Sequence, residues 1–250
     1  MTTVAQPTGE IGARFDRDGF VIVPELFRRE ETEAIKQEIR QIVEQAAREA
    51  RARGEQRPRL LATGVLVGLA ARSAYFRALV RDARLLDLLE PVVGPNLLFW
   101  SDKAVFKSEE TTLATPWHQD WAYWRGIHKI TVWLALDDAD ESNGCLKLVR
   151  GSHRLPVLHD AEVPPGEGFG HRVDARQVDE RDVVVAPVRA GGAVVFHDLL
   201  LHASCPNTSG RERWAWLPTY KDAQAQDLAY PAMTAAAVVR GTGASQSADC

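Results

Sequence analysis

Six segments between residues 97 and 220 share one pattern of hydrophobic and polar positions. Each is short, rich in β-branched or aromatic residues, and bounded by clusters of Gly, Pro, Asn and Asp, which is typical of β-strands. The six segments are residues 97–107, 129–136, 145–149, 183–188, 193–196 and 213–220. We expect them to be the strands of one all-β core.

The N-terminal part of the chain shows the helical period instead. After a short predicted strand at residues 18–24, residues 30–50 place apolar side chains three and four positions apart, which predicts a helix with one buried face. A second helical tract begins with Ser73 as its N-cap, and we expect Pro91 and Gly94 to stop it. Helices first and strands later predict a mainly β protein whose barrel is buttressed on one side by N-terminal α-helices.

The length and the loop composition predict the organisation of the chain. With 250 residues, 45% of them hydrophobic, the chain can bury a full core, so we expect one domain over residues 1–250. Residues 1–96 are expected to form the strand and helical buttress, and residues 97–220 the β-barrel core. The long polar segment 155–182 lacks a clear period, which predicts a lid. The small polar residues 241–250 predict a disordered tail.

Net charge, hydropathy and cysteine spacing indicate which binding partners and which cellular compartment to expect. A formal net charge of −4 provides no positive field for a phosphate backbone, so nucleic acid is not an expected partner. The start lacks the apolar core of a signal peptide, and the longest apolar run, residues 60–71, is too short to span a bilayer. Cys145, Cys205 and Cys250 show neither a paired nor a metal-binding spacing, which favours a reducing compartment. We expect a cytoplasmic protein that binds no membrane.

The segment Trp117-His118-Gln119-Asp120 holds the most informative candidate chemistry. In an extended segment alternate side chains share a face, so His118 and Asp120 can reach one metal ion while Gln119 turns away. His202, from a distant strand, would complete a set of two imidazoles and one carboxylate that leaves open positions, which favours ferrous iron and oxygen chemistry. Alone, the tripeptide is more often a solvated turn; the surrounding strands make the metal site the better interpretation.

Arg213 is a candidate for binding a second reactant. It lies eleven residues after His202, beyond a turn sequence that can bring its strand beside the histidine. The planar guanidinium makes two parallel bonds to a carboxylate, which lysine cannot reproduce, so it could hold the far end of a dicarboxylate. Ser204 shares the face of His202 by the period of two and can add a hydroxyl donor.

Several ordered motifs resemble the phytanoyl-CoA dioxygenase-like family of iron(II) and 2-oxoglutarate-dependent oxygenases. They are residues 15–23 (FDRDGFVIV), 117–120 (WHQD), 143–146 (NGCL), 150–153 (RGSH), 202–207 (HASCPN) and Arg213. Together they span most of the chain. Arg150 departs from the family, which usually carries proline there, but this position lies in a loop.

The resemblance implies a fold and a set of roles. The fold would be a double-stranded β-helix, a jelly-roll or cupin-like core. His118, Asp120 and His202 would bind Fe(II), and Arg213 would bind the distal carboxylate of the cosubstrate 2-oxoglutarate. Ser204 and Trp133 would line that cosubstrate, Lys103 would face the carboxylate nearer the metal, and O2 would take the remaining position.

Other residues near the motif are weaker candidates. Tyr123 and Trp124 follow the ligands in an expected pocket-mouth loop, so they are candidates for substrate contact. His197, at a strand end, is as readily structural as substrate-facing. The acids at 137–141 lack the spacing of a calcium loop, and a turn explains them better.

The expected function is hydroxylation of an unactivated C–H bond of a small metabolite, coupled to decarboxylation of 2-oxoglutarate to succinate. A tailoring step in secondary metabolism, on a small hydrophobic or polycyclic substrate, fits the lack of a basic patch that coenzyme A would need. Epimerisation, cyclisation and desaturation use the same iron site and stay open, whereas the carboxylate of Asp120 disfavours halogenation.

Two alternatives belong to other functional classes. One is a non-catalytic or zinc-loaded β-barrel binding protein, and the other is an oxygen-independent cupin-type isomerase or hydrolase. The sequence is compatible with a monomer or a homodimer.

Overall fold

The computed structural model describes residues 8–56, 61, 63–108, 114–154, 156–157, 170–226 and 234–243. Two antiparallel sheets dominate these residues. The major sheet has the strand order β1 (Phe20–Val23), β8 (Ala193–His197), β5 (Ile130–Ala135), β10 (Arg213–Asp222), β3 (Leu97–Lys107) and β11 (Ala237–Arg240), and β2 (Val65–Val67) also pairs with β3. The minor sheet has the order β4 (Thr115–His118), β9 (His202–Ser204), β6 (Leu146–Val149) and β7 (Val183–Ala186).

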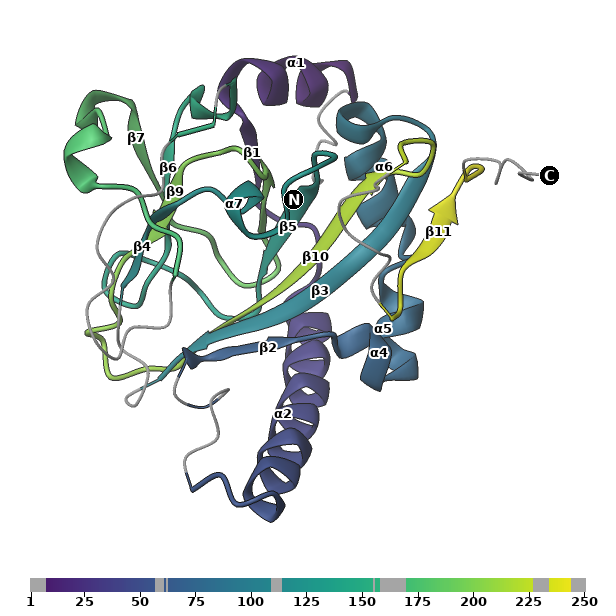
Figure 1. The fold of residues 1–250 in the computed structure, drawn as a ribbon, viewed down its shortest axis with the longest axis vertical. Coiled ribbons are helices and arrows are strands. Elements are labelled where there is room, and N and C mark those ends of the chain that lie inside the picture. The colour runs from purple at the N-terminus through teal and green to yellow at the C-terminus, as the bar shows by residue number, and fades with distance from the viewer. Residues whose placement is uncertain are drawn as a thin grey trace.

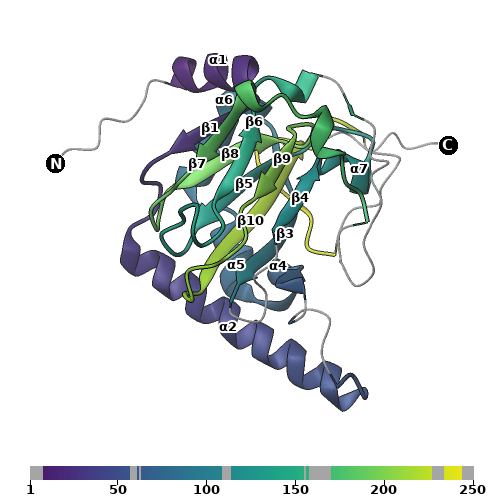
Figure 2. The same ribbon diagram turned by 90° about the vertical axis from the view of Figure 1, so that its left-hand side faces the viewer.

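The helices are α1 (Thr8–Asp18), α2 (Arg29–Ala52), α4 (Leu69–Arg72), α5 (Ala74–Leu79), α6 (Ala83–Val93) and α7 (Trp121–Trp124), with 3-10 turns at Ser152–Arg154, Ala175–Gln177 and Glu180–Asp182. The helices α2 and α4 to α6 cover one face of the major sheet, and the minor sheet covers the other, while α1 lies across the top and α7 beside the minor sheet (Figures 1 and 2). In Figure 1 the minor sheet lies to the left of β3 and β10, while α2 and α4 to α6 lie below and to the right. The mainly β fold with an N-terminal helical buttress is confirmed.

Period-two alternation divides the strand residues between two cores. On β10, Trp214 and Trp216 face the helices in the larger core, whereas Ala215 and Leu217 face the space between the sheets. Phe106 on β3 stacks on Trp214 at 4.4 Å between ring centroids, which anchors the helical side. Because both faces of the major sheet are covered, its strands read as nearly continuous apolar runs.

The predicted strands between 97 and 220 form, with small shifts at their ends, and β1 and α2 also lie where the sequence places them. The second helical tract differs. It divides into α5 and α6, where Asp82 accepts the backbone N–H of Arg84 at 2.9 Å and begins a new helix. Pro91 does not stop α6; it lies in the last turn, where only one internal hydrogen bond is lost, and the helix ends at Gly94.

Several short or peripheral elements were not expected: α1, β2, α4, β4, α7, β9 and β11. The ligand His118 therefore does not simply follow β3 but ends a separate strand of the minor sheet. Strands of three or four residues carry too little periodic signal to be recognised without their partners. Of the predicted lid at 155–182, residues 155 and 158–169 lie outside the described residues, as do residues 244–250 of the predicted tail.

Candidate metal and cosubstrate site

His118 and His202 lie directly opposite each other on neighbouring strands. The β4–β9 register pairs them, and their ring centroids are 4.2 Å apart. Asp120 follows β4 by two residues, and its carboxylate Oδ1 lies 3.5 Å from His118 Nε2. One ligand atom from each of the three buried residues lies within 4.8 Å of the others. The structure therefore brings together the three residues that the sequence nominated.

Backbone carbonyls orient both imidazoles. Nδ1 of His118 lies 2.9 Å from the carbonyl oxygen of Pro116, and Nδ1 of His202 lies 2.9 Å from that of Leu200. Because a carbonyl can only accept, Nδ1 carries the proton in each ring and Nε2 keeps its lone pair. Hydrogen bonds of this kind fix the tautomer that a metal ion requires.

The electrostatics of the three residues suit a divalent cation. Burial, together with the neighbouring His118, lowers the pKa of His202 to about 3, so its imidazole is neutral at physiological pH. Burial alone would raise the pKa of Asp120, but Lys103 and the two histidines outweigh it and hold that pKa below its usual range. Oδ2 of Asp120 has no hydrogen-bond partner among the described residues, and Lys103 Nζ lies 3.7 Å from it. A buried carboxylate oxygen without a donor is rare and fits a metal ligand.

The intervening Gln119 turns away from the histidines, as predicted, and ties the ligand segments together. Its amide Nε2 donates to the Leu199 carbonyl at 2.6 Å, and its Oε1 accepts from the Val157 N–H at 2.9 Å. The backbone N–H of Trp121 donates to the Asp198 carbonyl at 3.0 Å. The turn that leads into His202 is thus fastened to the segment that carries Asp120.

Arg213 lies between the sheets with an unsatisfied guanidinium. Its side chain is 1% exposed, and within the described residues neither Nε nor Nη1 has a hydrogen-bond partner. The guanidinium carbon lies 5.3 Å from the centre of the buried Trp133 ring. Burial lowers the pKa of Arg213 to about 10, yet the group stays charged at neutral pH. Such an unpaired buried cation costs free energy unless an anion joins it, which fits a carboxylate ligand.

Ser204 lies two residues beyond His202, near the same chamber. Its hydroxyl accepts the backbone N–H of Thr115 at 3.3 Å, which links the ends of β4 and β9. A hydroxyl that accepts one hydrogen bond can still donate its own proton to a carboxylate.

The structure places two of the candidate substrate contacts, His197 and Trp124, away from the space beside His202. On β8, Phe196 faces the chamber, with its ring 4.7 Å from that of His202, so the adjacent His197 faces the opposite side. There the His197 ring lies 6.3 Å from Phe15 of α1 and 4.7 Å from His128. Trp124 is buried in α7 rather than in a mouth loop; its indole donates to Asp198 Oδ2 at 2.9 Å.

Tyr123 lies at the rim, also on α7. It is 37% exposed, its ring stands edge-on to His118 at 6.2 Å, and its hydroxyl lies 3.5 Å from the His171 carbonyl oxygen. It therefore combines proximity to a ligand with exposure, as a substrate contact requires.

The sequence analysis did not nominate Lys107, Phe196 or Asp198, which lie near the candidate site: Lys107 opposite Arg213, Phe196 beside His202, and Asp198 against the segment after Asp120. Lys107 could have been found, because it lies four positions after Lys103 on one strand and so shares its face. Asp198 gave no comparable signal, since its partners come from α7 and from the segment before β5.

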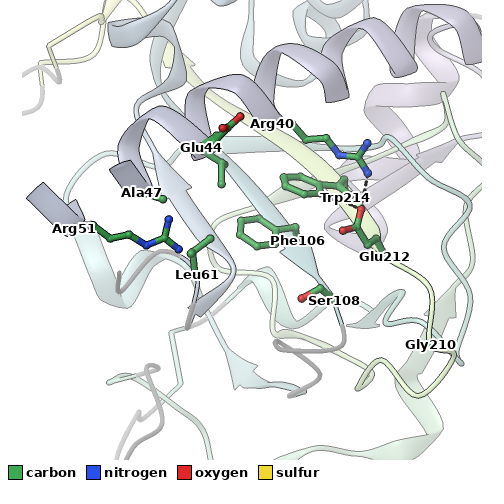
Figure 3. A pocket seen from close by; sticks show the side chains of 11 residues that line it. Arg40, Glu44, Ala47, Arg51, Leu61, Phe106, Ser108, Gly210, Glu212 and Trp214 are labelled. Carbon is green, nitrogen blue, oxygen red and sulfur yellow. Dashed lines mark hydrogen bonds and ion pairs between the residues drawn. The ribbon is translucent and has the colours of Figure 1, made fainter. Parts of the chain in front are cut away.

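A groove of about 660 Å³ lies elsewhere, between α2 and the outer face of the major sheet (Figure 3). Phe106 and Trp214 form its floor, with Arg40 beside Trp214 and Arg51 at the other end, near Leu61. None of the three candidate metal ligands lines it. This groove is therefore separate from the candidate metal site.

The helices in the described ranges include none with the length and apolar character that a bilayer crossing requires.

Known proteins share both the sequence pattern and the fold. L-proline trans-4-hydroxylase of Streptomyces griseoviridis is 27% identical over 245 residues, which cover 87% of this chain and 88% of that protein. Ectoine dioxygenase of Halomonas elongata is 27% identical over 220 residues, covering 78% of this chain and 64% of that protein.

Solved structures of non-heme oxygenases share the fold of this chain. The apo form of the non-heme monooxygenase ThoJ superposes with a TM-score of 0.73 at 26% identity, covering 94% of this chain and 85% of ThoJ. The 2-oxoglutarate-dependent carbocyclase SnoK from nogalamycin biosynthesis shares the fold, with a TM-score of 0.68 at 22% identity over 90% of this chain and 87% of SnoK. The profile of the phytanoyl-CoA dioxygenase (PhyH) family matches residues 15–215. The chain therefore belongs to the PhyH family of Fe(II)/2-oxoglutarate-dependent dioxygenases.

Proposed function

We propose that the chain hydroxylates an unactivated C–H bond of a small metabolite, with His118, Asp120 and His202 as the iron ligands. Two observations carry the proposal: Asp120 Oδ2, beside two oriented imidazoles, and Nε and Nη1 of the Arg213 guanidinium are all buried without a hydrogen-bond partner among the described residues. Zinc would accept the same three ligands, but a zinc-loaded binding barrel leaves Arg213 without a role.

We assign the imidazole and carboxylate side chains to the metal ion and the basic side chains to the carboxylates of 2-oxoglutarate. Two imidazoles and one carboxylate supply the charge and the single face that ferrous iron prefers, with open positions for reactants. Arg213 would bind the distal carboxylate of 2-oxoglutarate, with Ser204 and the ring of Trp133 beside it. Lys103, 3.7 Å from Asp120, would hold the cosubstrate carboxylate nearer the metal. When bound, iron and 2-oxoglutarate supply the oxidising power and yield succinate, while the protein positions and shields the reactants.

Hydroxylation is favoured over halogenation because Asp120 occupies the position that a halide would need. The relatives include enzymes named as a hydroxylase and dioxygenases, whereas some structural neighbours are named as an epimerase or a carbocyclase. Substrate placement separates these outcomes. Tyr123, at the rim beside His118, is the residue that we expect to contact the substrate.

The test is succinate formation from 2-oxoglutarate. Protein loaded anaerobically with Fe(II) and 2-oxoglutarate is exposed to air with panels of small cyclic amino acids and polycyclic metabolites, and products are identified by mass. A gain of one oxygen atom that matches the succinate formed supports hydroxylation, and a loss of two hydrogens indicates desaturation or ring closure. Absence of both Fe(II) binding and succinate with every substrate would leave the binding-protein alternative. Turnover in argon without 2-oxoglutarate would favour the cupin-type isomerase or hydrolase.

A further inference from the structure

A second buried cation lies beside Arg213. The β3–β10 register places Lys107 directly opposite Arg213, so the two side chains leave neighbouring strands on the same face of the sheet. Both are almost completely buried, at 4% and 1% exposure. Like charges directly opposite each other in a sheet destabilise it, and burial strengthens the repulsion.

The surrounding chain holds Lys107 in this position. Its ammonium Nζ donates to the Cys205 carbonyl at 2.6 Å. Gly144, at φ +99°, presses against its stem: a Cβ on that residue would lie 2.7 Å from Lys107 Cδ and 2.9 Å from the Cys205 oxygen. A lysine confined in this way cannot swing out to solvent.

The acidic group that attracts Arg213 is already engaged. Asp137 Oδ1 accepts from Lys36 Nζ at 2.7 Å, and its Oδ2 accepts from the Trp214 N–H at 2.9 Å. The groups that influence Lys107 are Arg213 on β10 and the thiols of Cys205 and Cys145 at the ends of β9 and β6. Behind Cys145 lie the carboxylates of Asp140 and Glu141.

We propose that Lys107 is a second binding residue for the distal carboxylate of 2-oxoglutarate, so that this end of the cosubstrate site is dicationic. The proposal rests on the assignment of Arg213 to that carboxylate. One anion placed between the two cations removes their repulsion and meets the unsatisfied donors of Arg213. The binding of a dicarboxylate is then favoured over that of a 2-oxo acid without the distal carboxylate.

The proposal also predicts that Lys107 takes up a proton when 2-oxoglutarate binds. Burial and the charge of Arg213 lower the pKa of Lys107 to about 7. An anion beside the ammonium raises that pKa again, so 2-oxoglutarate binding above neutral pH takes up a proton. Arg213 takes up none at pH 8, because its pKa of about 10 keeps it charged there.

The experiment compares Lys107→Met with Lys221→Met by calorimetric titration into Mn(II)-loaded protein, which binds the cosubstrate without turnover. Lys221 is a matched control, since it is also buried and its Nζ donates to a backbone carbonyl, that of Ala225 at 2.9 Å, but it lies at the other end of β10. Lys107→Met is expected to raise the Kd of 2-oxoglutarate roughly tenfold to hundredfold, as for loss of one member of a buried charge pair. The Kd of 2-oxovalerate, which has the same chain length but lacks the distal carboxylate, should hardly change.

Titration in buffers of different ionisation enthalpy adds a readout that a purely structural lysine would not move. The wild type should take up close to one proton per 2-oxoglutarate at pH 8 and almost none at pH 6, since a pKa of about 7 leaves Lys107 mostly neutral only at the higher pH. Lys107→Met should show no uptake, and Lys107→Arg should restore affinity without uptake.

Equal weakening of 2-oxoglutarate and 2-oxovalerate, unchanged binding, or proton uptake that persists in Lys107→Met would each overturn the role of Lys107. Failure of the wild type to bind 2-oxoglutarate at all would instead remove the proposed function.

Discussion

The described part of the chain holds two groups of two histidines and one aspartate that differ in how their polar atoms are hydrogen-bonded. The inner group is His118, Asp120 and His202; the outer group is His128, His197 and Asp198. In each, ligand atoms from all three residues lie within 4.8 Å of one another. By composition and spacing alone, either could be a metal site.

Hydrogen bonding separates the two groups. In the outer group, Asp198 Oδ1 accepts from His128 Nδ1 at 3.0 Å, and Oδ2 accepts from the Trp124 indole and the Lys129 N–H. The Leu199 N–H donates to His197 Nδ1 at 3.0 Å, so that nitrogen is also engaged. The inner group instead leaves Asp120 Oδ2 without a donor in the described part of the chain. The outer aspartate thus supports the fold, and the inner one is available to a ligand.

The strongest test of this contrast is Asp120→Ala. Removing the only carboxylate of the inner group should abolish Fe(II) binding and succinate formation, because two imidazoles alone hold the ion weakly. The melting temperature of the metal-free protein should fall far less than that of Asp198→Ala, since Asp120 Oδ2 has no hydrogen-bond partner among the described residues. Metal content and calorimetric melting measure the two effects. A variant that keeps iron and turnover would remove Asp120 from the site.

The corresponding substitution in the outer group is Asp198→Ala. It leaves the Trp124 indole and the Lys129 N–H buried without an acceptor, so we expect a loss of about 3 kcal/mol in the free energy of unfolding. Urea unfolding measures it. The folded fraction should still bind one Fe(II) per chain. A stable variant with impaired iron binding would mean that the outer group is the metal site.

Arg213→Lys sharpens the comparison within the inner chamber. Lysine keeps the charge but loses the planar fork, so the affinity for 2-oxoglutarate should fall by about 2 kcal/mol, while Fe(II) binding stays the same. Calorimetric titration of 2-oxoglutarate measures the change. An unchanged affinity would show that Arg213 does not hold the cosubstrate.

The smallest expected effect is that of His128→Gln. The hydrogen bond to Asp198 raises the pKa of His128, so its contribution to stability is present at acid pH and is lost as the pH rises through that raised pKa. Because the side chain is half exposed, the contribution should stay below about 1 kcal/mol. Urea unfolding should show a deficit for the variant at pH 5.5 and none at pH 8.5. The reverse order would mean that neutral His128 is the stabilising form.

The sequence by itself determined the longer periodic elements and nominated the candidate site residues. The strands β3, β5, β6, β7, β8 and β10 are rich enough in apolar and β-branched residues to be recognised alone. His118, Asp120, His202 and Arg213 stand out because their residue types suit iron and a dicarboxylate.

Only the tertiary structure decided which groups meet and which way they face. The β4–β9 register that sets His118 opposite His202 involves strands too short to predict, and the pleat that turns Phe196 inward turns His197 outward. The pairing of Lys107 with Arg213 depends on a contact between residues far apart in the chain. Local sequence encodes period and residue chemistry, whereas the satisfaction of a buried charge depends on every segment that packs around it.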